Sequence, residues 1–172
     1  MNYKKNAILL TTSTLLMIGC ASTAPQTHTQ FMKDVDNASS LTKIFINTSE
    51  KDANVNFSRA VSNSRKQLQA CLPATTTTYG VTGTMVSGAS TIRHSATVKQ
   101  ISSKKAQVTV KADQGLTFGP KGGDIMYAAD ITRTGSNRIH IKSASAINYP
   151  NLDDAIIGWA KGSKSCYNLP RF

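Results

Sequence analysis

Apolar and polar residues alternate along most of the chain between residues 75 and 142. Such a period of two predicts strands with one face buried and one face in water, as in an antiparallel sheet covered on one side. Short polar connections at 102–104 and 134–136 fit hairpins, and 113–124 forms a longer loop. The apolar positions are Tyr79, Val81 and Met85, then Ile92, His94, Ala96 and Val98, then Ala106, Val108 and Val110, then Ile125, Tyr127, Ala129 and Ile131, and finally Ile139 and Ile141.

Two segments show the helical period instead. The first carries an apolar stripe and ends before Pro73, which cannot continue a helix. The second follows Pro150, with Asn151 as a cap and two aspartates at its positive end. The two stripes consist of Phe57, Ala60, Val61, Ser64, Leu68, Cys71 and Leu72, and of Leu152, Ala155, Ile156, Trp159 and Ala160.

The order of these elements predicts an α+β fold. A short apolar run at 43–47 adds a first strand, and 52–54 follows as a turn. We expect about five to six antiparallel strands with both helices on one face, in a single domain covering residues 41–172. Residues 20–40 are polar and predict a flexible tether, roughly 60–70 Å long at about 3.3 Å per residue. In the alternative, Phe31 and Met32 dock on the domain.

The first twenty residues carry a targeting signal. Lys4 and Lys5 precede an apolar run that is too short to span a bilayer as a helix, which predicts a secretory signal over residues 1–19. The end of this run, Leu16 to Cys20, resembles the bacterial lipobox, although Met17 replaces the usual leucine. The resemblance implies cleavage before Cys20 and acylation of its thiol and amine, palmitate being a typical chain. Ala21, which is not aspartate, implies sorting to the outer membrane, with the domain facing the periplasm.

Charge narrows the class of partner. The chain has 20 Lys+Arg, 9 Asp+Glu and a formal net charge of +11. Without Lys4 and Lys5 the mature chain keeps 18 basic side chains and a net charge of +9. A basic excess favours anionic partners. Outside the cytoplasm these are lipid head groups, acidic envelope polymers or an acidic partner protein.

The two remaining cysteines, Cys71 and Cys166, follow the two predicted helices. In an oxidising compartment we expect a disulfide between them. Closing a loop of about 95 residues would contribute somewhat over 4 kcal/mol in the chain-entropy model. Two buried thiols or a redox pair are the alternatives, although redox pairs usually have the C-x-x-C spacing.

Over residues 41–168 the order of strand, helix, antiparallel strands and helix resembles the helix-grip architecture. It is also similar to the small α+β domains of lipoproteins in outer-membrane assembly machinery, such as the C-subunit of the β-barrel assembly complex. Element order alone carries this resemblance, so it implies a fold and an envelope role but no catalytic residues.

Candidate chemistry is sparse. The glycine-rich loop Gly115–Gly123 lacks the spacing of a P-loop, although Phe118 and Lys121 at its tip could contact a partner. His94 falls on the apolar face and His140 on the polar face, so the two are not expected to share a metal. Glu50 is the sole glutamate, which excludes paired glutamates for acid–base work. We therefore predict no enzyme, no metal and no cofactor other than the lipid on Cys20.

One surface remains a candidate for binding. The polar sheet face gathers cations interleaved with Ser and Thr, which either keep the sheet soluble or bind an anionic envelope component. None of the aromatic residues falls on this face, so nucleic acid is not expected as a partner. The residues of this candidate basic face are Arg93, Lys99, Lys105, Lys111, His140 and Lys142.

Two functions follow from these patterns. The first is a non-catalytic, outer-membrane-anchored lipoprotein that serves as an accessory or scaffold component of an envelope complex. The second is a domain that binds a small ligand, a glycan or an anionic envelope polymer. Its cavity would lie between helix and sheet, with Tyr79 and His94 as polar groups inside.

Overall fold

A computed structural model describes residues 27–38, 45–72, 75–82, 85–113, 123–147 and 149–166. For residues 75–82 and 85–90 the structure describes the backbone alone. The described part is an α+β fold with a six-stranded sheet, as the sequence predicts. The strands are β1 (Ile46–Ala53), β2 (Thr75–Thr82), β3 (Met85–Gln100), β4 (Lys105–Asp113), β5 (Asp124–Gly135) and β6 (Arg138–Ala146).

Every neighbouring pair of strands is antiparallel, and the order across the sheet is β1-β6-β5-β4-β3-β2. Strands β2 to β6 pair in chain order as successive hairpins. The first strand of the chain, β1, pairs with the last, β6. The register sets Glu50 opposite Lys142 and Asp52 opposite His140. Residues some 90 positions apart in the chain therefore become neighbours on one sheet face.

The first strand is displaced from its predicted position. The sequence places it at 43–47 and a turn at 52–54, whereas β1 covers Ile46–Ala53. Polar residues dominate β1 because it is an edge strand and needs few buried side chains. The turn begins only at Asn54, and the Asn56 side chain then caps the next helix by accepting a hydrogen bond from the Arg59 backbone N–H (3.2 Å).

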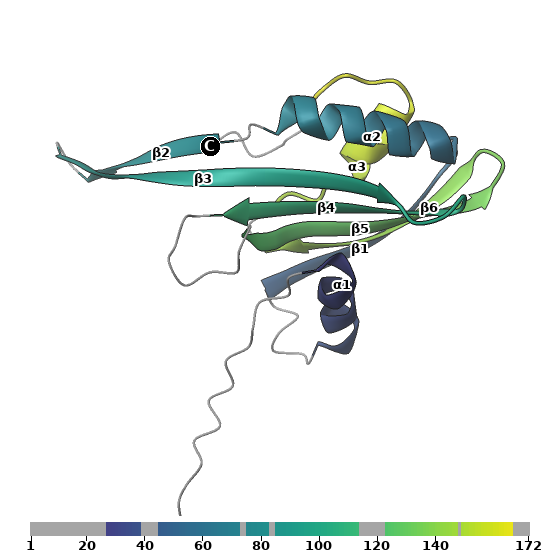
Figure 1. Cartoon of the computed structure of the whole chain (residues 1–172), viewed down its shortest axis with the longest axis horizontal. Helices are drawn as coiled ribbons and strands as arrows, with labels where there is room; N and C mark the ends of the chain where they lie inside the picture. Colours follow the sequence, from purple (N-terminus) through teal and green to yellow (C-terminus); the bar gives the residue numbers. More distant parts are fainter. Residues whose placement is uncertain are drawn as a thin grey trace, which may run out of the picture.

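Two helices cover one face of the sheet, as expected (Figure 1): α2 (Phe57–Cys71) and α3 (Asp153–Ala160). Between them and the sheet lies the main core, in which Tyr127, Ile139, Ile141, Ile156 and Trp159 have no exposed surface. The N-cap of α3 is Leu152 and not Asn151 as expected, and Leu152 makes no side-chain capping hydrogen bond. Asn151, one residue earlier, accepts a hydrogen bond from the Asp153 backbone N–H (2.8 Å).

A third helix, α1 (His28–Asn37), lies on the opposite face of the sheet (Figure 1). This segment belongs to the predicted flexible tether, so the tether prediction is wrong for these ten residues. Phe31, Met32 and Val35 pack on Ile125, Ala128 and Ala144 in a second, smaller core. The alternative expectation, that Phe31 and Met32 dock on the domain, is the one confirmed.

The disulfide between Cys71 and Cys166 is present, with Cα atoms 5.3 Å apart. It joins the last residue of α2 to the segment after α3, as predicted from the sequence. Trp159 reinforces this connection, because its indole N–H donates to the backbone oxygen of Ser165 at 2.7 Å. The C-terminal segment is therefore fixed to the helix layer at two adjacent points.

Candidate functional site

The candidate basic face does lie on one side of the sheet, on strands β3, β4 and β6. It is the side on which α1 packs. Asp130 and Asp52 occupy the same side, and α1 brings Asp36 to it. The expected positive patch is therefore a mixed surface of cations and carboxylates.

Asp130 of β5 is the best-connected carboxylate on this side. It accepts hydrogen bonds from His28 (3.1 Å), Lys105 (2.9 Å) and Gln107 (3.3 Å). Burial by itself would raise the pKa of Asp130, but the bonds from His28 and Lys105 lower it to about 2. His28 also bonds to Thr109 (2.9 Å), so the first residue of α1 is attached to both β4 and β5.

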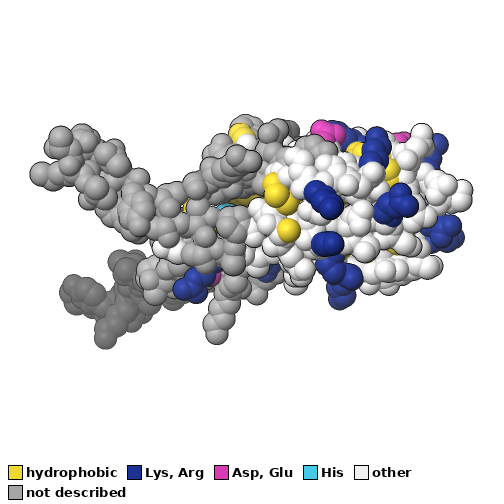
Figure 2. Space-filling view, turned by 90° about the horizontal axis from the view of Figure 1, so that it is seen from above, with side chains coloured by type: hydrophobic (Ala, Val, Ile, Leu, Met, Phe, Trp, Pro, Cys, Tyr) yellow, Lys and Arg dark blue, Asp and Glu magenta, His cyan; other side chains and the backbone are white. Residues whose placement is uncertain are grey.

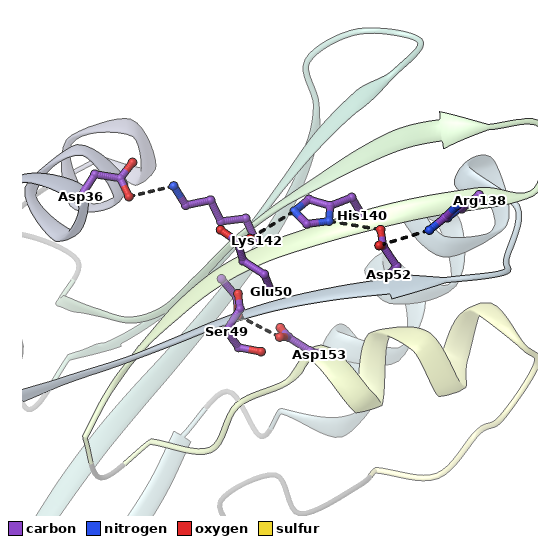
Figure 3. A network of polar contacts seen from close by, with 9 residues as sticks. Asp36, Ser49, Glu50, Asp52, Arg138, His140, Lys142 and Asp153 are labelled. Atoms are coloured by element: carbon purple, nitrogen blue, oxygen red, sulfur yellow. Dashed lines mark hydrogen bonds and ion pairs between the residues drawn. The ribbon is translucent and has the colours of Figure 1, made fainter.

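A second chain of ion pairs runs along β6 and β1 (Figure 3). Lys142 reaches Asp36 of α1 at 2.8 Å, and this hydrogen bond raises the pKa of Lys142. His140 lies 3.2 Å from Asp52, which also accepts from Arg138 at 3.3 Å. At least three of the six predicted cations, namely Lys105, His140 and Lys142, thus contact carboxylates.

The pairing of these cations with carboxylates could not be predicted from the sequence, for a physical reason. Glu50 and Asp52 lie on β1, whose pairing with β6 cannot be read from local periodicity. Asp36 lies in a segment interpreted as a tether. Exposed ion pairs of this kind contribute little to stability, about 0–1 kcal/mol each, but they remove the uncompensated charge that would attract an anion.

The α1 side also has a hollow of about 430 Å³ between α1 and strands β1 and β6. Apolar and charged groups of both signs share its walls, so it has no single chemical preference. The lining residues are Val35, Asp36, Ala38, Ile46, Thr48, Ser49, Glu50, Lys142 and Ser143.

Within the described residues, the exposed cations of α2, α3 and the segment after α3 form no ion pair with a carboxylate. Figure 2, which looks onto α2 and α3, shows Lys and Arg side chains spread over this face and few acidic ones. Helix α2 itself contains no carboxylate. Asp154 of α3 is exposed and is paired with Lys51 at 2.7 Å. The exposed cations of the helix layer and the segment after it are Arg59, Arg65, Lys66, Lys161 and Lys164. Sequence periodicity did not single out this surface, because its cations are spread over two distant segments.

A buried polar cluster joins α3 to the sheet. The Asp153 carboxylate is fully buried and accepts hydrogen bonds from Tyr127 (2.7 Å) and Ser143 (3.0 Å). Burial, and then the negative charge of Asp153, raise the pKa of Tyr127 well above its ordinary value. The cluster has no opening to solvent, so its role is to fix the position of α3.

The main core fills most of the space beneath α2, but a hollow of about 220 Å³ remains between α2 and β3, lined by Arg65, Leu68, Gln69, Ala96, Thr97 and Val98. Phe57, Ala60, Val61 and Leu68 are at most 3% exposed and pack in the main core. His94 is buried on the β3 face expected for it, and burial lowers its pKa. The side chain of Tyr79 lies outside the described residues, so the proposed pairing of Tyr79 and His94 in a cavity stays a prediction.

Other expectations fall on residues outside the described ranges. These are the signal and the lipidated Cys20, and the loop tip with Phe118 and Lys121. Within the described ranges no cluster of three or more His, Cys, Asp and Glu side chains could hold a metal ion. None of the described helices is long and apolar enough to cross a membrane.

Comparison with known proteins adds little. No protein-family model and no curated protein matches the chain. Among solved structures, a hypothetical protein of Helicobacter pylori, determined at 1.88 Å resolution, is 8% identical, with a TM-score of 0.35. The match covers 67% of this chain and 81% of that one. A likeness of this strength carries no argument about fold or function.

Proposed function

We propose that the protein is a non-catalytic lipoprotein of the bacterial outer membrane, anchored through Cys20. In this proposal it serves as an accessory or scaffold component of a cell-envelope complex. The resemblance of Leu16 to Cys20 to a lipobox supports the anchor, and the Cys71–Cys166 disulfide is consistent with an oxidising compartment.

The position of α1 is the observation that supports this proposal most strongly. Helix α1 begins at His28, eight residues after Cys20. Eight extended residues reach roughly 25–30 Å, less than half the span expected for a tether of twenty. With Cys20 in the membrane, the domain would be held near the lipid surface, and its α1 side would face that surface.

This arrangement leaves the helix layer for a partner. Helices α2 and α3 lie on the side of the sheet opposite to α1 (Figure 1). Their surface is cationic, and a partner that carries an acidic surface would be drawn to it. The domain would thus hold an acidic envelope protein at a short, fixed distance from the membrane.

Site-specific photo-cross-linking in intact cells tests this orientation. A photoreactive residue at Gln69, exposed on α2, is expected to capture one reproducible partner protein. The same residue at Lys33, exposed on α1, is expected to capture lipid or nothing. Capture of one partner at Lys33 and none at Gln69 would contradict the orientation, and capture of none at both sites would contradict the scaffold role.

The Lys66→Glu variant with the photoreactive residue at Gln69 provides the electrostatic control. It reverses one charge near the reporter without touching the core, since Lys66 is exposed. We expect lower capture at low ionic strength in washed membranes, where surface charges are least screened. Capture that is independent of both the variant and salt would contradict an acidic partner surface.

A further inference from the structure

A hollow of about 760 Å³ lies at the end of the molecule where three connections meet. These are the link from β1 to α2, the turn from β5 to β6, and the end of α3. This volume is within the range of small-molecule sites, about 300–1,000 Å³. The lining residues are Asn54, Val55, Asn56, Arg59, Asn137, Ala160 and Lys161.

The charge of this hollow is wholly positive. Arg59 and Lys161 are its two ionisable lining residues, and both are exposed. Among the described residues, no carboxylate forms an ion pair with either. Asp52, two residues before Asn54, is on the opposite sheet face, where it pairs with Arg138 and His140.

The partial charges of the nearby helix ends do not change the positive charge of the hollow. Helix α2 begins at the hollow and α3 ends there, so a partly positive and a partly negative helix end meet. Because these two contributions oppose each other, the attraction for an anion comes from the guanidinium of Arg59 and the ammonium of Lys161.

Three asparagines complete the polar lining. A carboxamide offers both donors and an acceptor, and these are the groups that pair with sugar hydroxyl and acetamide groups. The Asn56 oxygen is held by the Arg59 backbone N–H at 3.2 Å, which fixes the orientation of that side chain. Asn54 and Asn137 face the hollow from two other connections.

The walls are held in place by the fold. Val55 and Ala160 are buried beneath the hollow. The Asn63 amide of α2 donates to the Trp159 backbone oxygen at 2.7 Å, which fastens the end of α3 to α2. These contacts fix the backbone around the hollow, whereas the exposed side chains of Arg59 and Lys161 would be ordered only when a ligand binds.

We propose that this hollow binds an acidic sugar, that is, a carbohydrate bearing a carboxylate or a phosphate. Arg59 and Lys161 would bind the anionic group, and the asparagines would bind hydroxyl or acetamide groups. The proposal goes beyond the anchored scaffold function and does not depend on the lipid at Cys20.

The proposed sugar binding is tested by NMR titration of the mature protein in a non-ionic detergent, with backbone amide chemical shifts as the readout. The probes are N-acetylmuramic acid for the carboxylate source and N-acetylglucosamine 6-phosphate for the phosphate source. Neutral N-acetylglucosamine and inorganic phosphate are the controls. We expect at least one acidic sugar to cause saturable changes in the amide chemical shifts of residues 54–59, 137 and 160–161. That sugar should bind more tightly than either control.

Charge variants identify the binding groups. Arg59→Gln and Lys161→Gln should each weaken binding of the acidic sugar by about tenfold, as expected for loss of one charge-assisted hydrogen bond. Lys66→Gln removes the same charge two turns further along α2 and should change affinity less than about twofold. Unchanged circular dichroism and melting temperature would show that each variant folds.

Three results would overturn the proposal. The first is no saturable binding of either acidic sugar up to about 20 mM. The second is equal weakening by Lys66→Gln, which would indicate general attraction to the helix layer. The third is equal affinity for inorganic phosphate or the neutral sugar, which would remove the acidic-sugar class. None of these results bears on acylation of Cys20, so the two proposals fail independently.

Discussion

At the scale of single residues, the most informative groups are buried polar ones. Asp153 is predicted from the sequence only as a favourable charge at a helix start. The structure gives it a second role, because its buried carboxylate accepts hydroxyl hydrogen bonds from Tyr127 and Ser143. That role depends on strands β5 and β6 lying under α3, which local sequence does not reveal.

Tyr127→Phe tests this role. The variant leaves the Asp153 carboxylate buried with one hydrogen bond fewer, so we expect the free energy of unfolding to fall by about 1–3 kcal/mol. Urea denaturation measures the change. Tyr149→Phe is the matched control. The buried Tyr149 hydroxyl has no hydrogen-bond partner among the described residues, so its removal should leave the free energy of unfolding unchanged or raise it. A larger loss for Tyr149→Phe than for Tyr127→Phe would contradict the assignment.

Asp130 predicts a pH dependence. Its pKa in the folded protein is about 2, below the unfolded value of about 3.9. The stabilisation is therefore fully present above pH ~4 and is lost as pH falls toward 2. Asp130→Asn should flatten the decline of unfolding free energy over this window, measured by denaturation at several pH values. A decline of unchanged steepness would show that His28 and Lys105 do not act through Asp130.

At the scale of elements, strands with a buried face and the two core helices are predictable from periodicity. Helix α1 is not, because Phe31, Met32 and Val35 are its only buried residues and the rest is polar. Its formation depends on docking to the sheet. One local signal was available: Thr27 and Gln30 have the spacing of a capping box, and the Thr27 side chain accepts from the Gln30 backbone N–H.

Because α1 rests on its own small core, it should open separately from the sheet. Phe31→Ala removes a large part of that core, and hydrogen exchange measured by mass spectrometry should show lost protection in residues 28–37 alone. Lys33→Ala, on the exposed side of the same helix, is the control and should leave protection unchanged. Simultaneous loss of protection in β5 and β6 would show that α1 and the sheet form one cooperative unit.

At the scale of the whole molecule, the two faces of the sheet have different surroundings. One is covered by α1 and by paired charges. The other is covered by the helix layer, whose exposed cations form no ion pair with a carboxylate among the described residues. The composition shows an excess of basic residues, but it does not show on which face of the molecule they lie. At least half of the cations of the candidate basic face are paired, because strand register and α1 docking bring carboxylates to them.

The orientation of the whole molecule depends on the anchor, and the most direct test is the intact mass of the protein extracted from bacterial membranes. The lipobox resemblance predicts a chain that begins at Cys20, carries three acyl chains and fractionates with the outer membrane. It also predicts that Cys20→Ala yields a chain that keeps the Cys71–Cys166 disulfide but leaves the membrane fraction. A chain with an unmodified Cys20, released as a free periplasmic protein, would contradict anchoring through Cys20.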